Sequence, residues 1–123
     1  MKMGKAGELI AMVFVGRDMA HRAHLSTRSY AEHMALGGFY EGIIPLVDGF
    51  AEAYQGRFNE LLDIPLADND FEGEIGDVLE QQMSWIEDNR EAIAPRSESA
   101  LHNALDEIVS LYQATLYKLR FLS

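Results

Sequence analysis

The chain has 123 residues, enough for one domain with its own core and too few for two. Apolar residues make up 48% of it and charged residues 24%, which excludes a wholly disordered protein. Lys and Arg total 10 and Asp and Glu total 20, so the formal net charge is −10. This charge argues against a dedicated surface for nucleic acid or an anionic membrane, because both need clustered basic residues. The absence of Cys excludes disulfides and thiolate zinc sites.

No segment predicts membrane insertion or export. The longest apolar run near the start, residues 9–15, is too short to cross a bilayer, and it lacks a signal-peptide cleavage pattern. We therefore expect a soluble cytoplasmic protein that forms a single domain over residues 1–123.

Helical periodicity dominates the chain, and strand alternation is scarcely visible. The first helix is predicted at residues 6–24, after which Ser26 and Thr27 supply a break and an N-cap. A second helix is predicted at residues 28–55, and Pro45 inside it predicts a kink or two stacked shorter helices. The positions expected to be buried in these two helices are Leu9, Ile10, Val13, Phe14, Ala20, Met34, Ile43, Val47, Phe50 and Tyr54.

The second half of the chain predicts an antiparallel helical hairpin. One helix is expected at residues 73–92, and another follows Pro95, with Ser97 or Ser99 as its N-cap. Residues 56–72 must carry the chain back from the end of the second helix, a long crossover of the kind that ferritin-type bundles use. The predicted fold is therefore all-α, a ferritin-like four-helix bundle. The stripes of the last two helices comprise Ile75, Leu79, Gln82, Ile86, Ile93, Leu101, Leu105, Ile108, Tyr112, Thr115, Leu119 and Leu122.

Four residues stand out as a set of metal ligands: His21, His33, Asp48 and Glu52. His21 ends the first predicted helix and His33 lies in the second turn of the next, so the turn between them can bring the two imidazoles together. Asp48 and Glu52 are four residues apart and share one helical face. Two imidazoles with two carboxylates suit iron, manganese or zinc better than calcium or magnesium.

One chain cannot complete this site. His33 and Asp48 lie fifteen residues apart on one predicted helix, about 22 Å, so they cannot hold the same ion. A two-fold axis near residues 39–41 would lay two copies antiparallel and bring the imidazoles of one opposite the carboxylates of the other. Three glycines flank this midpoint and would let the helices approach closely: Gly37, Gly38 and Gly42.

The segment from His21 to Glu52 resembles the signature of the Dps miniferritins, the DNA-binding proteins from starved cells. In that family two His, an Asp and a Glu follow one another at the intervals seen here. The context Asp48-Gly-Phe-Ala-Glu52 also resembles the family's Asp-x-x-Ala-Glu. Short phage-encoded proteins that resemble miniferritins exist, and this chain fits among them.

The resemblance implies a ferroxidase that oxidises Fe(II) with peroxide or oxygen and stores the ferric product inside a shell of twelve subunits. It implies His21 and His33 as iron ligands from one subunit and Asp48 and Glu52 as ligands from its neighbour, with Glu52 bridging two irons. One or two non-haem irons would occupy each site, and zinc or manganese are alternatives.

Several positions depart from the family. Arg22 stands where the family has Trp, so an aromatic electron donor is missing, and Gly37 stands where the family places an acidic residue. The basic N-terminal arm that binds DNA in some members is reduced to Lys2 and Lys5, so DNA binding is not carried over. These departures support a second hypothesis, a non-catalytic helical oligomer or binding protein that retains the fold. A DNA-compacting protein is a third hypothesis, which the net charge opposes.

The candidate ligands also have structural explanations. His21 and His33 can hydrogen-bond locally at helix ends, and Asp48 and Glu52 can belong to a solvated face.

Other His and Tyr residues are expected to have supporting roles. His24 and Tyr30 are expected to contact the metal ligands without binding the metal themselves. His102 is expected at the surface. Tyr30, Tyr40 and Tyr54 also fit core aromatic residues better than redox relays.

Residues 63–88 carry nine carboxylates and no basic residue. They form a solvated surface or, as the resemblance implies, an entry route that draws Fe(II) into a cage. The segment from Asp68 to Gly73 also resembles the opening of an EF-hand loop, but Leu79 occupies the twelfth position, where that loop needs a bidentate Glu. The expected entry residues are Asp63, Asp68, Asp70, Glu72, Glu74 and Asp77.

Overall fold

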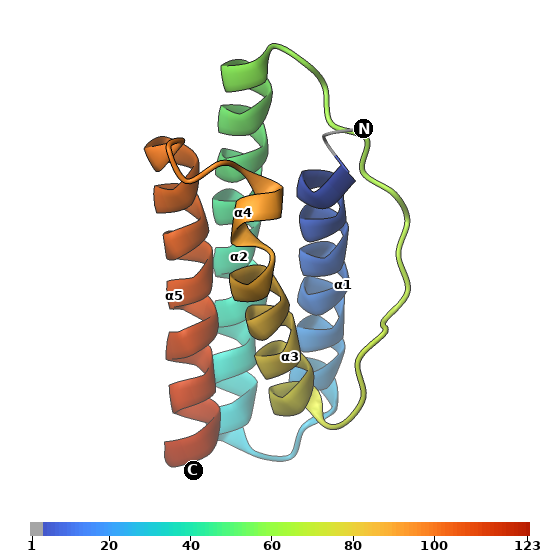
Figure 1. The fold of residues 1–123 in the computed structure, drawn as a ribbon. Coiled ribbons are helices and arrows are strands. Elements are labelled where there is room, and N and C mark those ends of the chain that lie inside the picture. Colours follow the sequence, from blue (N-terminus) through green and yellow to red (C-terminus); the bar gives the residue numbers. More distant parts are fainter. Residues whose placement is uncertain (1–3) are drawn as a thin grey trace.

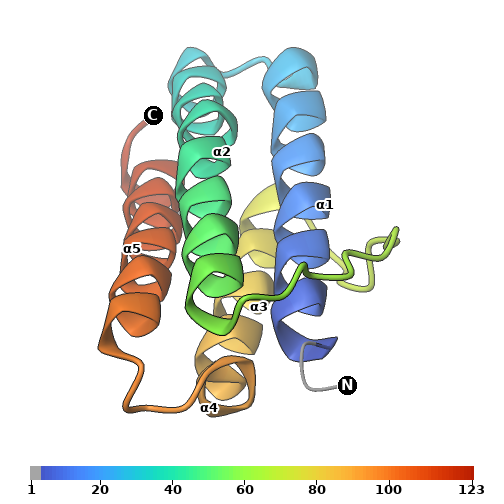
Figure 2. The same cartoon turned by 90° about the horizontal axis from the view of Figure 1, so that it is seen from above.

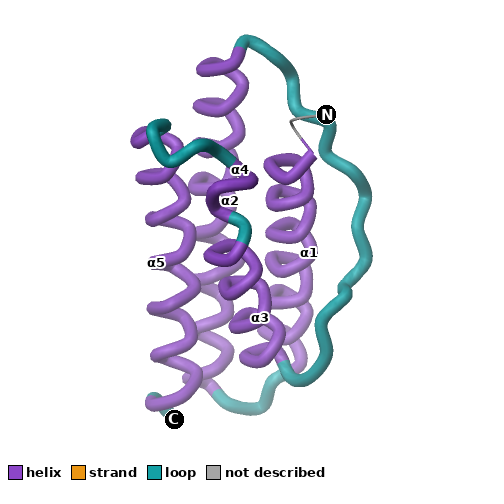
Figure 3. Tube along the Cα trace, in the orientation of Figure 1, coloured by secondary structure: helices purple, strands orange, loops and turns teal. Residues whose placement is uncertain are grey.

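The computed structural model describes residues 4–123, and every regular element in that range is an α-helix (Figure 3). The elements are α1 (Gly4–Ser26), α2 (Tyr30–Phe58), α3 (Ile75–Asp88), α4 (Arg90–Ile93) and α5 (Ser99–Phe121). The all-α prediction is confirmed, although five helices form where four were predicted. None of the helices within residues 4–123 has both the length and the apolar character needed to cross a membrane. Lys2 lies outside the described residues.

The long helices lie side by side (Figures 1 and 2). α1 and α2 run antiparallel and are joined by the short turn at residues 27–29. Residues 59–74, which we call the crossover, then run along the outside of α1 to the end of the molecule where α2 began. As a result α3 points in the same direction as α2, and α5 returns antiparallel to both. α2 and α3 each pack against α1 and α5.

The core is built from one face of each long helix. Buried apolar side chains repeat every three or four residues along the helices and form one continuous cluster. Within it, the fully buried Phe39 of α2 and Tyr112 of α5 meet edge to face, with their ring centroids 5.0 Å apart. Three residues predicted to be buried are exposed instead: Phe14 (47%), Met34 (55%) and Leu122 (49%). Phe14 and Met34 lie beside the buried stripes of their helices, and Leu122 follows the last residue of α5.

α2 runs without a break through Pro45, so the predicted alternative of two stacked helices is wrong. Pro45 is exposed, and so is Glu41, whose carbonyl loses its helical N–H donor. Water can hydrogen-bond to that carbonyl from the solvent side, and the missing donor therefore does not end the helix.

The helices begin at residues other than the predicted ones. Ser29 caps α2 by accepting a hydrogen bond from the backbone N–H of Glu32 (3.1 Å). The third predicted helix is interrupted at Asn89, which separates α3 from α4, and Glu98 is the residue before the first turn of α5. The break predicted at Ser26 and Thr27 is confirmed, because α1 ends at Ser26, whereas the predicted N-caps at Thr27, Ser97 and Ser99 are wrong.

A buried polar side chain connects three helices. Gln82 of α3, which is 1% exposed, donates from Nε2 to the carbonyl of Met12 in α1 (3.0 Å). Its Oε1 accepts a hydrogen bond from the hydroxyl of Tyr112 in α5 (2.7 Å). Gly16 leaves room for this amide, because a Cβ at that position would collide with Gln82 Oε1. Burial raises the pKa of Tyr112, so its hydroxyl stays protonated as the donor.

The prediction that His102 lies at the surface is wrong, because α4 and the link to α5 fold over it. His102 is 7% exposed, and its Nε2–H donates to the carbonyl of Ala94 (2.9 Å). Its Nδ1 faces a guanidinium nitrogen of Arg90 (3.4 Å). Arg90 is also buried, and it donates to the carboxylates of Glu87 (2.6 Å) and Asp106 (2.5 Å). These bonds fasten α4 to both α3 and α5.

The substitution Gln82→Leu should lower the free energy of unfolding by about 1–3 kcal/mol, because it leaves the buried Tyr112 hydroxyl without a partner. Chemical denaturation followed by circular dichroism measures this loss. Gln113→Leu makes the same change at an exposed position of α5 and should alter stability by less than about 0.5 kcal/mol. Equal effects of the two variants would show that the buried amide adds nothing to stability.

Replacing Gly7 and Gly56 by alanine should change the stability of the protein in opposite directions. A Cβ on Gly7 would collide with the backbone carbonyl of Asp63, so Gly7→Ala should destabilise the protein by about 1–3 kcal/mol. Gly56 has nothing within 4 Å of an added Cβ, and Gly56→Ala should stabilise α2 by about 0.5–1 kcal/mol. Thermal denaturation measures the change in stability of each variant. A Gly7→Ala protein as stable as the parent would mean that the crossover shifts away from α1 without cost.

Candidate functional site

The hairpin of α1 and α2 brings four aromatic rings together. His24 of α1 and His33 of α2 stack with their ring centroids 3.7 Å apart and their planes at 17°. His21, almost one turn before His24, stacks on Tyr40 of α2 with the centroids 4.0 Å apart. His24 also approaches the edge of Tyr40 (5.2 Å) and the ring of His21 (6.3 Å). The two predicted imidazoles therefore belong to one cluster, which we call the imidazole cluster: His21, His24, His33 and Tyr40.

The turn at residues 27–29 sets the register of this cluster. The Thr27 hydroxyl donates to the carboxylate of Glu32 and accepts a hydrogen bond from the backbone N–H of Ser29 (3.1 Å). Ser29 in turn caps α2. Because so few residues join the helices, His24 and His33 face each other across the hairpin although they are nine residues apart.

His24 and His33 each hydrogen-bond to the other's backbone. Nδ1 of His24 donates to the carbonyl of His33 (2.6 Å), and Nδ1 of His33 donates to the carbonyl of His24 (2.9 Å). A carbonyl can only accept, so each Nδ1 carries the proton in these bonds, and Nε2 of the neutral ring keeps a free lone pair. Backbone carbonyls commonly orient metal-binding imidazoles in this way. The backbone bonds therefore occupy Nδ1 of both rings and leave Nε2 as the nitrogen with a lone pair.

Neighbouring side chains extend the cluster. The guanidinium of Arg17 lies 5.8 Å from the centroid of the Tyr40 ring, and its Nε is buried without a hydrogen-bond partner. Tyr30 stacks loosely on His33 at 6.3 Å and is 76% exposed, so it is not a core aromatic residue, whereas Tyr54 is buried. Sequence reasoning gave Arg17 no role and took Tyr40 for a core aromatic. The sequence spacing indicates that both lie on the same helix faces as the histidines: Arg17 precedes His21 by four residues, and Tyr40 follows His33 by seven.

Two of the three glycines at the predicted two-fold midpoint serve contacts within the chain. A Cβ on Gly37 would lie 3.1 Å from the His24 ring, and one on Gly42 would lie 3.3 Å from Leu111 of α5. Only Gly38 has nothing within 4 Å. That the three glycines let a second copy of the helix approach closely stays a prediction, and Gly38 is the one whose Cβ position is free of contacts within the chain.

Asp48 and Glu52 lie one turn apart on the exposed side of α2. Because α2 is continuous, the fifteen residues from His33 to Asp48 span about 22 Å. Within residues 4–123, no three His, Asp or Glu side chains of the chain come together as a metal site. The exposed side of α2 is a stripe that steps by three or four residues and includes Met34, Gly38, Glu41, Pro45, Asp48, Glu52 and Gly56.

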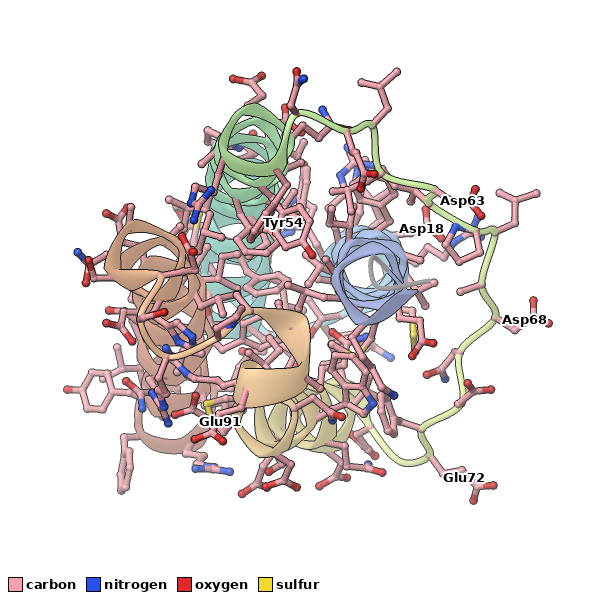
Figure 4. All side chains as sticks on the ribbon, turned by 45° about the horizontal axis from the view of Figure 1, so that its top comes forward. Asp18, Tyr54, Asp63, Asp68, Glu72 and Glu91 are labelled. Carbon is pink, nitrogen blue, oxygen red and sulfur yellow. The ribbon has the colours of Figure 1, made fainter. Side chains whose placement is uncertain are left out.

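The acidic residues predicted as an iron entry lie on the crossover and at the start of α3. Figure 4 shows Asp63, Asp68 and Glu72 spread along the outside of the molecule. Asp77 has a local role, because its carboxylate accepts a hydrogen bond from the backbone N–H of Glu74 (3.1 Å) and so caps α3. The remaining predicted entry residues, Asp70 and Glu74, are also exposed.

Comparison with known proteins identifies the family. Residues 24–119 match the family of unknown function DUF5856. The chain belongs to the DUF5856 family. An uncharacterized 14.6 kDa protein from the mobD-ri intergenic region of Enterobacteria phage T4 is 24% identical to this DUF5856 chain over 118 residues, 96% of this chain and 90% of the phage protein. No solved structure matches the chain. The DUF5856 match includes His24, His33, Asp48 and Glu52 and begins after His21.

The hydrogen bonds predict two different imidazole tautomers in this DUF5856 chain. Neutral His24 and His33 should carry the proton on Nδ1, whereas neutral His102, which donates from Nε2 to Ala94, should carry it on Nε2. Long-range ¹H–¹⁵N NMR correlations distinguish the two forms in one sample, with His102 as the internal control. Protons found on Nε2 of His24 and His33 would contradict the observed bonds and remove the free lone pairs.

Proposed function

We propose that this DUF5856 chain is a Dps-like ferritin that oxidises Fe(II) at sites shared between two copies. On this proposal α1, α2, α3 with α4, and α5 correspond to the four helices of a ferritin-like bundle. The parallel directions of α2 and α3 support this assignment, because an up-down-up-down bundle with short loops would make them antiparallel. The crossover at residues 59–74 then corresponds to the long connection of that fold.

The division of the candidate ligands along α2 is the observation that carries the proposal. The imidazole cluster has free Nε2 lone pairs at one end of the helix, and Asp48 and Glu52 are exposed about 22 Å further along. A second copy of α2, antiparallel and crossing near Gly38 and Glu41, would place each imidazole cluster beside the carboxylates of the other copy. A two-fold axis makes two such sites per pair.

Fe(II) is the substrate of the proposed site. Imidazole nitrogens and carboxylate oxygens together suit Fe(II) and leave positions open for an oxidant. Two Fe(II) ions and one hydrogen peroxide molecule, with two protons, give two Fe(III) ions and two waters, so both electrons pass from iron into the O–O bond that breaks. Anionic oxygens favour this direction because they stabilise Fe(III) more than Fe(II).

The charge of the chain supports a role in iron supply. The net charge of −10 attracts cations, and the exposed carboxylates of the crossover concentrate that charge on one side of α1. The proposal includes a shell of twelve subunits in which these carboxylates lead Fe(II) towards the stored ferric product.

A second candidate is a non-catalytic assembly in which the imidazole cluster only fastens α1 to α2. The reciprocal bonds between His24 and His33 favour it, because they are complete within one chain. Arg22 also favours it, since this side chain pairs with Asp18 at the surface (2.7 Å) and supplies no aromatic ring. In this candidate His33→Ala would reduce stability and leave iron chemistry unchanged.

Anaerobic titration with Fe(II), followed by addition of peroxide, tests the leading proposal. The native protein should bind iron saturably and give a rise in ferric absorbance, and His33→Ala and Glu52→Ala should each reduce the rate at least tenfold. Light scattering after gel filtration should show an oligomer in the same sample. A monomer, or a protein without an iron-dependent signal, would contradict the proposal.

Co-assembly of the two inactive variants tests whether the site is shared. In a random mixture of His33→Ala and Glu52→Ala chains, about a quarter of all sites receive intact imidazoles from one chain and intact carboxylates from the other. Activity should therefore recover to about a quarter of the native value after the chains are unfolded and refolded together.

Mixing His33→Ala with His21→Ala provides the control. Both changes damage the same half of the site, so no pairing restores a complete set of imidazoles and activity should stay at the level of the single variants. Equal recovery in both mixtures would show that the ligands are not divided between chains in the proposed way.

A further inference from the structure

A cavity of about 210 Å³ lies between α1, α3 and residues 65–71 of the crossover. Its lining shares no residue with the imidazole cluster or with the exposed stripe of α2. Met12, Phe71 and Trp85 supply apolar wall from all three segments. An engineered protein cavity of about 150 Å³ holds benzene, so this space is large enough for a small organic molecule.

Every charged residue that lines the cavity is acidic: Glu8, Asp68 and Asp70. The Asp68 side chain points away from α1 (Figure 4), and the other two acidic lining residues are Glu8 and Asp70. Their negative charge opposes an anionic ligand and favours a cation.

The chain already places an ammonium group at the edge of this cavity. Nζ of Lys5 lies 5.4 Å from the centroid of the Trp85 ring and 3.3 Å from a carboxylate oxygen of Glu8. Both Glu8 and Trp85 line the cavity, although Lys5 does not. An aromatic face and a carboxylate therefore hold a cation together at this position, as they do in sites for organic ammonium ligands.

We propose that the cavity binds a small organic cation, a protonated primary amine carried on an apolar group about the size of a benzene ring. The apolar group fills the space beside Met12 and Phe71, and the ligand's ammonium replaces that of the partly exposed Lys5 side chain beside Trp85 and Glu8. A divalent metal ion is a poorer occupant, because thioether, indole and phenyl groups cannot replace its oxygen ligands. This binding is independent of the iron chemistry proposed above.

Trp85 is the one tryptophan in the chain, so its fluorescence reports on this cavity directly. Phenethylamine should change the fluorescence saturably, and it should bind at least ten times more tightly than 2-phenylethanol, a neutral molecule of the same size and shape. No saturable change, or equal affinity for the amine and the alcohol, would overturn the proposal.

Two matched double variants test the role of the lining carboxylates. Glu8→Gln with Asp70→Asn removes two charges from the lining and should weaken phenethylamine binding at least fivefold. Asp63→Asn with Glu72→Gln removes two charges from the same side of the molecule outside the lining, and it should change binding less than twofold. Equal weakening in both would show that only the overall charge attracts the amine, which would overturn the assignment of Glu8 and Asp70.

Discussion

Each residue advances an α-helix by about 1.5 Å, and the 29 residues of α2 therefore form a rod more than about 40 Å long. One side of this rod packs between α1 and α5, so its direction and rotation are fixed by the core. The opposite side is exposed along its whole length and carries Asp48 and Glu52. Every side chain on α2 consequently has a fixed position along the helix axis and a fixed direction around it. Side chains that lie far apart along the axis cannot meet within one chain, and this constraint underlies the proposed pairing of two copies.

The helices could be predicted from the sequence because the apolar spacing of their buried faces is a local property. Their ends could not be predicted as well, because more than one polar residue near a helix start can cap it; Ser29, and not Thr27, caps α2. Pro45 does not break the helix, and both it and Glu41, whose carbonyl it deprives of a donor, are exposed residues. The exposure of Phe14 and Met34 likewise depends on which side of each helix the neighbours occupy, which a single stripe of apolar residues defines only approximately.

In the candidate site, too, features that are local in the sequence could be predicted, and contacts between helices could not. The sequence alone indicates that Asp48 and Glu52 share a face and that His21 and His33 flank a turn. It does not indicate that His24 stacks on His33, because this contact depends on the register that the turn imposes. His102 was misjudged for a related reason: its burial depends on α4, a helix of four residues that leaves little periodic signal. Both errors concern residues whose partners lie across a turn or a link.

The contacts that hold His24 against His33 join residues only nine positions apart in one chain, so they need no second copy to form. The imidazole half of the proposed site would therefore be ready in every newly made copy, while completion requires an encounter whose rate depends on concentration. On that proposal a lone copy cannot turn over iron, and peroxide chemistry begins only once the protein has become abundant. The concentration of the protein would then control when iron oxidation begins, without any conformational change in the fold.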